Sequence, residues 1–231
     1  MADEKQNNKI IGIRYVILSV SFFLLYYTLF IFVYSQSDEV SLTSQLKKDN
    51  NILRIVGEIK NLLDTAITNI TMAVSFYDES GQIISNQTRF SELRTVNPYS
   101  ISPYEIMFYD PKNIEKIENY TIRVNYNKTH IKDQLLFLKE NKSRLDITGN
   151  YFVYGAVENR GNETSYNTNV IVTFYDAEGK VIGIGRGQTE HYDIPANSAA
   201  GFGIVFFNRD LLMSNSYKIY VESLNYITDT N

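Results

Sequence analysis

The sequence contains no cysteine among its 231 residues. This absence excludes a disulfide scaffold, a thiolate nucleophile, an iron–sulfur cluster, a Cys-ligated zinc and a blue-copper centre. Histidine is scarce, because only His130 and His191 are present, and their spacing is not that of a zinc protease. We therefore expect solvated or locally bonded histidines, and neither a metal nor a cofactor.

The sequence also has too little positive charge for a nucleic-acid-binding protein. The chain has 22 Lys and Arg against 26 Asp and Glu, a formal net charge of −4, and no basic run. Nucleic-acid binding requires clustered cations that neutralise phosphates, so we expect no nucleic acid. A hydrophobic content of 44% is enough to build a core.

Motifs of catalytic sites are missing as well. The sequence has no G-x-S-x-G nucleophile motif and no P-loop, so we see no candidate nucleophile paired with a base. Gly183, Gly185 and Gly187 resemble a phosphate-binding loop, but no helical pattern follows them. Glycines in a strand more often mark a bulge or a bend. We therefore predict that the protein is not an enzyme.

One long uncharged run is present near the N-terminus. Residues 15–37 are 23 residues without charge, mostly Leu, Ile, Val, Phe and Tyr, and a bilayer core requires about 20 apolar residues in a helix. Lysine and arginine occur in residues 1–14, and acidic residues follow the run. The positive-inside rule then predicts a single-pass protein of the cell membrane, with its N-terminus inside and its C-terminal domains outside.

A cleaved signal peptide is the alternative for the same run. Val33, Tyr34 and Ser35 precede Gln36 with residues that a signal peptidase can read. Signal peptides, however, usually have a shorter apolar region of about 7–15 residues. Both interpretations export the C-terminal part, in one case as an anchored domain and in the other as a secreted one.

The exported part contains an internal repeat. The segment VSFYDESGQII at 74–84 matches VTFYDAEGKVI at 172–182, and a Gly-x-x-x-Asn motif precedes each. An offset of 98 residues relates four landmark pairs, namely Gly57 and Gly155, Asn61 and Asn159, Asp78 and Asp176, and Gly81 and Gly179. A constant offset over separated motifs indicates two homologous domains.

Each copy has the pattern of antiparallel β structure. Apolar and polar residues alternate in 52–59 and 151–158, and β-branched and aromatic residues dominate 71–77 and 170–175. An Asp-x-x-Gly turn follows in both copies, where aspartate can hold its own backbone and glycine can take a positive φ. We predict an all-β chain of two tandem immunoglobulin-like antiparallel β-sandwich domains, preceded by one N-terminal transmembrane helix.

These patterns predict the domain boundaries. They are a cytoplasmic N-terminus at 1–14, a transmembrane helix or signal anchor at 15–37, a linker at 38–51, a first sandwich at 52–126, a connector at 127–148 and a second sandwich at 149–228. Within the connector, residues 130–140 (HIKDQLLFLKE) are the one stretch with the character of a soluble helix.

The two repeated blocks resemble a known family. VSFYD at 74–78 and VTFYD at 172–176 resemble the signature of the FxLYD domain, with Val in place of the first Phe and Phe in place of Leu. The resemblance covers residues 52–126 and 149–228. It implies an immunoglobulin-like β-sandwich of exported or membrane-anchored prokaryotic proteins, and it transfers no catalytic residue. The residues that define the repeat are Gly57, Asn61, Phe76, Tyr77, Asp78, Gly81, Gly155, Asn159, Phe174, Tyr175, Asp176 and Gly179.

Acidic residues at turns and tyrosines near prolines are the remaining candidates for ligand binding. Asp78 with Glu79, and Asp176 with Glu178, could bind calcium at loop tips, but no EF-hand pattern is present and a turn role explains each aspartate. Exposed tyrosines can bind sugars or proteins. The best candidates are Tyr99, Tyr104 and Tyr192, which lie near prolines.

Glycosylation acceptors occur throughout the exported part. The Asn-x-Ser/Thr motif is present at Asn69, Asn86, Asn119, Asn127, Asn141 and Asn162. We expect modification of at least one site where the host has the enzymes.

The sequence therefore predicts a non-catalytic, membrane-anchored cell-surface protein that presents two β-sandwich interaction modules. Its contact with the membrane is the N-terminal helix, and the sequence does not identify its protein or glycan partner. The alternatives are an accessory or assembly subunit of a membrane complex, and a secreted domain after signal cleavage.

Overall fold

The computed structural model describes residues 39–49, 51–147, 150–207, 211 and 214–228. The predicted cytoplasmic segment at 1–14 and transmembrane helix at 15–37 lie outside these residues. Within the described part, no helix is long and apolar enough to cross a membrane. The described chain is almost entirely antiparallel β structure.

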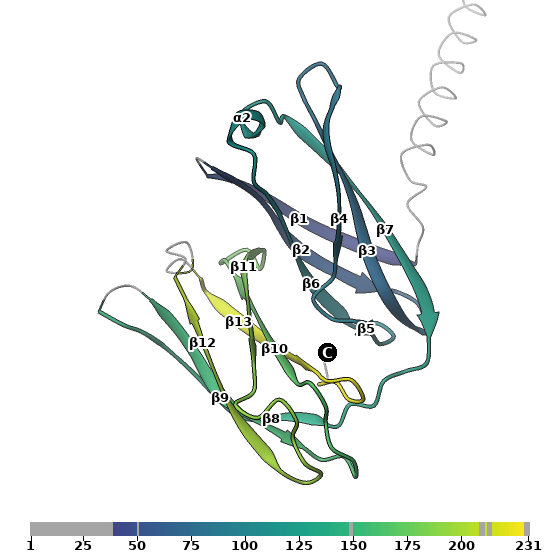
Figure 1. Ribbon diagram of the computed structural model, residues 1–231, viewed down its shortest axis with the longest axis vertical. Helices are drawn as coiled ribbons and strands as arrows, with labels where there is room; N and C mark the ends of the chain where they lie inside the picture. Colours follow the sequence, from purple (N-terminus) through teal and green to yellow (C-terminus); the bar gives the residue numbers. More distant parts are fainter. Residues whose placement is uncertain (1–38, 50, 148–149, 208–210, 212–213, 229–231) are drawn as a thin grey trace, which may run out of the picture. The chain divides into compact units, whose positions relative to one another are not determined.

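The first half of the described chain contains two antiparallel sheets (Figure 1). Its elements are β1 (Val40–Asp49), β2 (Ile52–Asn61), β3 (Ala66–Tyr77), β4 (Ile83–Phe90), β5 (Thr95–Val96), β6 (Ile101–Phe108), the short helix α2 (Pro111–Ile114) and β7 (Asn119–Thr129). One sheet has the order β1-β2-β6. In the other, β3 is the central strand and pairs with β4, β5 and β7.

The second half repeats this arrangement. Its strands are β8 (Leu136–Leu145), β9 (Tyr151–Asn159), β10 (Asn169–Tyr175), β11 (Val181–Gln188), β12 (Ala199–Phe206) and β13 (Ser216–Glu222). The sheets have the orders β12-β9-β8 and β11-β10-β13. Apart from the two-residue strand β5, each strand of the first half has a counterpart with the same neighbours in the second half, so the repeated sequence corresponds to a repeated topology.

Each half encloses a hydrophobic core, as in a β-sandwich, and the first cluster continues to Ile171 and Tyr220 of the second half. In the first half, Ile55 and Ile59 of β2 point toward Met72 and Phe76 of β3 within one buried cluster. In the second half, Val153 and Val157 of β9 and Phe174 of β10 belong to the second cluster. Alternate residues of each strand share a face, so the apolar alternation in the sequence becomes the inner face of a sheet. Burying one such side chain contributes about 1.5–3 kcal/mol.

Two predicted connecting segments are wrong. Residues 38–51 were predicted as a linker, but 40–49 form β1, which pairs with β2 along its whole length. Residues 127–148 were predicted as a partly helical connector. Instead β7 continues to Thr129, and 136–145 form β8, which pairs with β9. Both new strands lie at sheet edges, so each pairs with a single strand. Many of their side chains are polar and face solvent, which weakens the alternation of apolar residues in the sequence.

Candidate functional site

The Asp-x-x-Gly turns have the same hydrogen bonds in both halves. The Oδ1 atom of Asp78 accepts two turn N–H groups, each at 2.9 Å, and Oδ1 of Asp176 accepts two at 3.1 and 2.8 Å. A hydrogen bond from the Ser80 hydroxyl is the main cause that lowers the pKa of Asp78. Gly81 and Gly179 have φ angles of 80° and 76°. These aspartates organise hairpins, and the described residues contain no cluster of three His, Asp or Glu suited to a metal.

The repeated Gly-x-x-x-Asn motifs also have structural roles. The amides of Asn61 and Asn159 are buried, and each donates to three backbone carbonyls at matching positions, 2.8–3.1 Å away in the first half and 2.8–3.2 Å in the second. A Cβ on Gly57 would lie 1.9 Å from the carbonyl oxygen of Thr43 on β1, and one on Gly155 would lie 2.0 Å from that of Glu140 on β8. Only glycine allows so close an approach of the edge strand.

The candidate binding tyrosines differ in their surroundings. Tyr99 and Tyr192 are 57% and 60% exposed. The prediction that Tyr104 is exposed is wrong, because this residue lies in β6, is fully buried and donates its hydroxyl to the carbonyl of Thr43 at 2.8 Å. Its position two residues before Ile106 on the strand places it on the inner face. The three residues do not form one site.

The remaining predicted residues lie mostly at the surface. His130 and His191 are exposed. The six acceptor asparagines, Asn69, Asn86, Asn119, Asn127, Asn141 and Asn162, are all exposed. The glycines of the G-x-G-x-G run lie in β11, and a Cβ on Gly185 would be 1.6 Å from the ring of Phe206. These glycines let Leu211 and the side chains of Phe206 and Ile204 on β12 approach β11 closely, so they are not a phosphate-binding loop.

Sequence reasoning missed the junction between the two halves, where polar groups bond across a buried apolar contact. The outer face of β2 lies against the second half, where Val56 is 0% exposed and packs in one cluster with Tyr175 and Val181. Three groups of charged or hydroxyl side chains surround this apolar contact. Because the contact is buried and polar groups bond across it, the two halves are joined through more than the connecting chain.

The first group joins one carboxylate to two tyrosines. Tyr175 donates its hydroxyl to Glu58 Oε1 at 2.5 Å, and the hydroxyls of Tyr175 and Tyr220 are 3.1 Å apart. Both rings are buried. Burial is the main cause that raises the pKa of each hydroxyl above the usual tyrosine value, and the charge of Glu58 adds to it. The protonated hydroxyls are therefore held as donors at neutral pH.

The second group centres on Arg186 of β11. Its guanidinium makes a forked contact with Glu92, with Nε 2.6 Å from Oε2, and its Nη1 donates to Glu105 at 2.9 Å. Arg54 Nε lies 3.1 Å from the other oxygen of Glu105. Burial opposes the charge of Arg186, but the hydrogen bonds and charges of Glu92 and Glu105 outweigh it and raise the pKa. Forked arginine–carboxylate contacts are among the stronger ion pairs.

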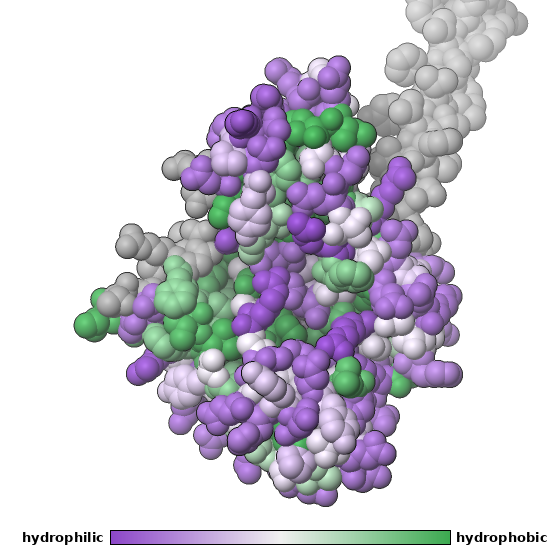
Figure 2. Space-filling model, in the orientation of Figure 1, coloured by the Kyte–Doolittle hydropathy of each residue, from purple (hydrophilic) through white to green (hydrophobic). Residues whose placement is uncertain are grey.

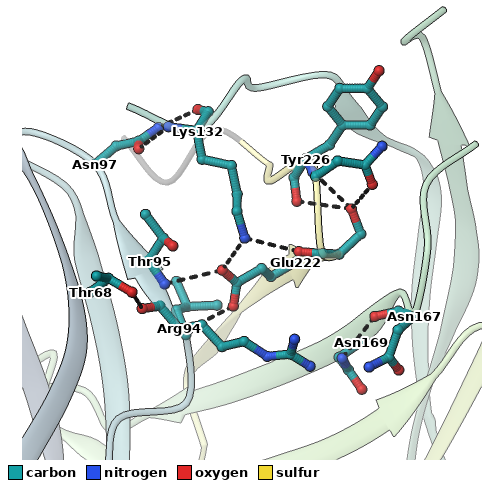
Figure 3. Close-up of polar contacts among 12 residues, drawn as sticks. Thr68, Arg94, Thr95, Asn97, Lys132, Asn167, Asn169, Glu222 and Tyr226 are labelled. Carbon is teal, nitrogen blue, oxygen red and sulfur yellow. Dashed lines mark hydrogen bonds and ion pairs between the residues drawn. The ribbon is translucent and has the colours of Figure 1, made fainter. Parts of the chain in front are cut away.

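The third group centres on Glu222 of β13 (Figure 3). This carboxylate is 4% exposed and accepts the backbone N–H groups of Arg94 at 2.7 Å and Thr95 at 3.1 Å. Lys132, in the segment that connects the halves, donates its ammonium to Glu222 at 2.7 Å and to the Ser223 carbonyl at 2.9 Å. One carboxylate thus ties a loop of the first half, the connecting segment and the second half together.

A small pocket of about 240 Å³ opens at this junction. In Figure 2 a hydrophobic patch lies over the region of β11 and β12, on a face that is otherwise mostly hydrophilic. The pocket walls include apolar side chains such as Met107 and Phe206, together with Arg54, Glu105 and Arg186. Those three charged groups already pair with one another. The volume is below the range of about 300–1,000 Å³ usual for small-molecule sites.

No protein-family model and no curated protein matches the sequence. Solved structures that resemble it include the transglutaminase of red sea bream, with 8% identity, a TM-score of 0.27, and coverage of 80% of this chain and 29% of that one. The exo-chitosanase CsxA of Amycolatopsis orientalis has 11% identity, a TM-score of 0.32, and coverage of 82% and 26%. The chain therefore spans less than a third of the length of these proteins.

Proposed function

We propose that this chain is a non-catalytic, single-pass membrane protein that presents two immunoglobulin-like modules of the FxLYD type outside the cell. The two modules act as one joined unit that offers its surface to a protein or glycan partner. The uncharged run at 15–37 supports the anchor, and the duplicated sheet topology supports the two modules.

The buried junction is the observation that supports the proposal of two modules acting as one unit. Glu222, Tyr175 and Arg186 each bond residues of the first half from strands of the second half. Interfaces between domains of one chain are otherwise small and allow relative motion. A junction with the buried ion pair of Lys132 and Glu222 suits a protein that holds its binding surface in a constant orientation. Two domains that move independently would have to lose this freedom of motion when a partner binds.

Membrane topology is tested by single-cysteine labelling, since the natural chain has no cysteine. We expect Tyr192→Cys, at a position that is 60% exposed, to react with a membrane-impermeant maleimide on intact cells. Ala2→Cys should react only after permeabilisation. The labelled protein should stay in the membrane fraction after alkaline extraction.

Other labelling results would contradict the proposal. Reaction of Ala2→Cys on intact cells would reverse the orientation, and protection of both positions would place the whole chain inside. Recovery in the medium of a protein shortened at its N-terminus would support the secreted alternative. An intact mass equal to the sequence mass would show that none of the six acceptor asparagines is modified.

A further inference from the structure

The same outer sheet face of the repeat is covered in one half and open in the other. In the first half, this face of β2 and β6 lies at the junction, where Val56 is fully buried. The corresponding face of the second half belongs to the β8-β9-β12 sheet. There Tyr154 of β9 is 41% exposed and Val205 of β12 is 39% exposed. The described part of the chain therefore leaves this second face open.

Residues on the open face form rows across three paired strands. From one end to the other, the rows are Arg144, Phe152 and Val205, then Lys142, Tyr154 and Gly203, then Glu140, Ala156 and Gly201, then Phe137, Glu158 and Ala199. The charged side chains on β8 are exposed and change sign along the strand. A Cβ on Gly203 would meet nothing within 4 Å. The face thus has an aromatic centre and charges of both signs along β8. On β12, Gly203 is open, whereas the carboxylate of Glu190 lies over Gly201, 3.0 Å from the position of a Cβ there.

We propose that this face binds the same face of a second copy of the chain. The two-fold axis crosses the strands between the row of Lys142 and the row of Glu140. This axis reverses the strand direction of the second copy, so Lys142 lies opposite the partner's Glu140, and Tyr154 lies opposite the partner's Ala156. In such an isologous contact every favourable pair occurs twice. The charge pattern along β8 is thereby self-complementary.

Other occupants fit this face less well. The open outer face of the first half carries Arg123 on β7, which is exposed and would place a like charge against Lys142 and Arg144. An anionic polymer would meet the two cations but also the carboxylate of Glu140. A second copy supplies an opposite charge to both signs.

Charge reversal tests this arrangement in the full chain in detergent, with the oligomeric mass measured by sedimentation over a concentration series. The wild type should be a reversible dimer of weak to moderate affinity, because a contact between three-stranded faces is small. Lys142→Glu and Glu140→Lys should each raise the dissociation constant at least about tenfold, since each places like charges opposite one another twice. Mixed together, the two variants should form heterodimers, because both cross-pairs are then of opposite sign.

The control is Arg123→Glu, which also reverses an exposed strand cation but lies on the other open face. It should leave the dissociation constant unchanged. A wild type that is monomeric at every concentration would overturn the proposal. So would a dimer that resists both reversals, because its contact would then lie elsewhere, including the N-terminal segment. Failure of the two variants to recombine would equally reject the two-fold pairing.

Discussion

Replacement of Glu222 by glutamine removes one charge from the junction and keeps the side-chain shape. The carboxylate uses Oε2 for the N–H of Arg94, and Oε1 for the N–H of Thr95 and the ammonium of Lys132. A glutamine has one carbonyl oxygen and one NH₂ group. In either orientation, its NH₂ group must face a donor that the carboxylate had accepted. The substitution therefore leaves at least one buried N–H without its partner.

The expected loss follows from the burial of these groups. A buried donor without a partner costs about 1–3 kcal/mol. Lys132 has a side chain that is 11% exposed, and removal of one member of a buried ion pair costs about 3–5 kcal/mol. These two losses describe the same site and overlap. We therefore expect Glu222→Gln to weaken the junction by about 3 kcal/mol.

Hydrogen exchange of the full chain in detergent measures this loss where it occurs. A decrease of about 3 kcal/mol in local stability corresponds to about 100-fold faster exchange of the Arg94 and Thr95 amides. The control is Glu178→Gln, whose side chain is exposed, and it should change stability by less than about 0.5 kcal/mol. Unchanged exchange at both amides would refute the reasoning, because the carboxylate would then not hold the loop in the folded protein.

Three further predictions concern the core strands and the tyrosine pair. Gly57→Ala should destabilise the first half by several kcal/mol, or prevent folding, because its Cβ would lie 1.9 Å from a β1 carbonyl. Urea unfolding measures both variants, and Gly203→Ala, whose Cβ would meet open space, should leave the free energy of unfolding nearly unchanged. Tyr175→Phe should lower the free energy of unfolding by about 1–3 kcal/mol, since Glu58 loses a buried hydrogen-bond donor. Tyr192→Phe, at an exposed position, should change it little. Equal effects of the two substitutions would contradict the hydrogen bond between Tyr175 and Glu58 at the junction. Because the folded-state pKa values of Tyr175 and Tyr220 are raised, stability should be full below the unfolded tyrosine value of about 10 and fall as pH rises above it. A spectrophotometric titration in which all tyrosines ionise together near that value, without unfolding, would disprove this.

The repeat is what made the β architecture predictable from sequence. Each of two copies is a weak signal, but the constant offset places Asp78 and Asp176 at the same turn and Asn61 and Asn159 at the same strand end. In the structure these pairs make matching hydrogen bonds. Local chemistry of this kind depends on residues close in sequence, so the pattern carries it directly.

Edge strands were harder to predict for a physical reason. β1 and β8 pair on one side only, and their solvent-facing residues are free to be polar. The segment LFLKENKSRL of β8 therefore has only Leu136 fully buried, and its remaining apolar residues also fit a short helix. The sequence pattern misplaces Tyr104 because the neighbouring Pro103 is more typical of a loop than of a strand. Proline is tolerated in an edge strand such as β6, where Pro103 lies.

The junction depends on pairs that no local pattern reveals. Arg186 and Glu105 are 81 residues apart, and Glu222 and Arg94 are 128 apart. One comparison within the sequence does contain a signal. Outward positions of the second copy are more apolar than their counterparts in the first, as Ile171 of β10 is against Ala73 of β3. An outer face that is apolar in one copy alone indicates a contact that only this copy makes.

The two copies meet through different faces, and this limits how far the protein can assemble. The outer face of β2 and β6 in the first half contacts the outer face of β10, β11 and β13 in the second. The junction uses one outer sheet face of the first half and a different outer face of the second half. Each half therefore keeps its other outer face open. The open face of the first half is polar and carries Arg123 and Asn86, which favours solvent or a glycan. The open face of the second half carries Tyr154 and the open Gly203, so the proposed association through it joins two chains and then stops.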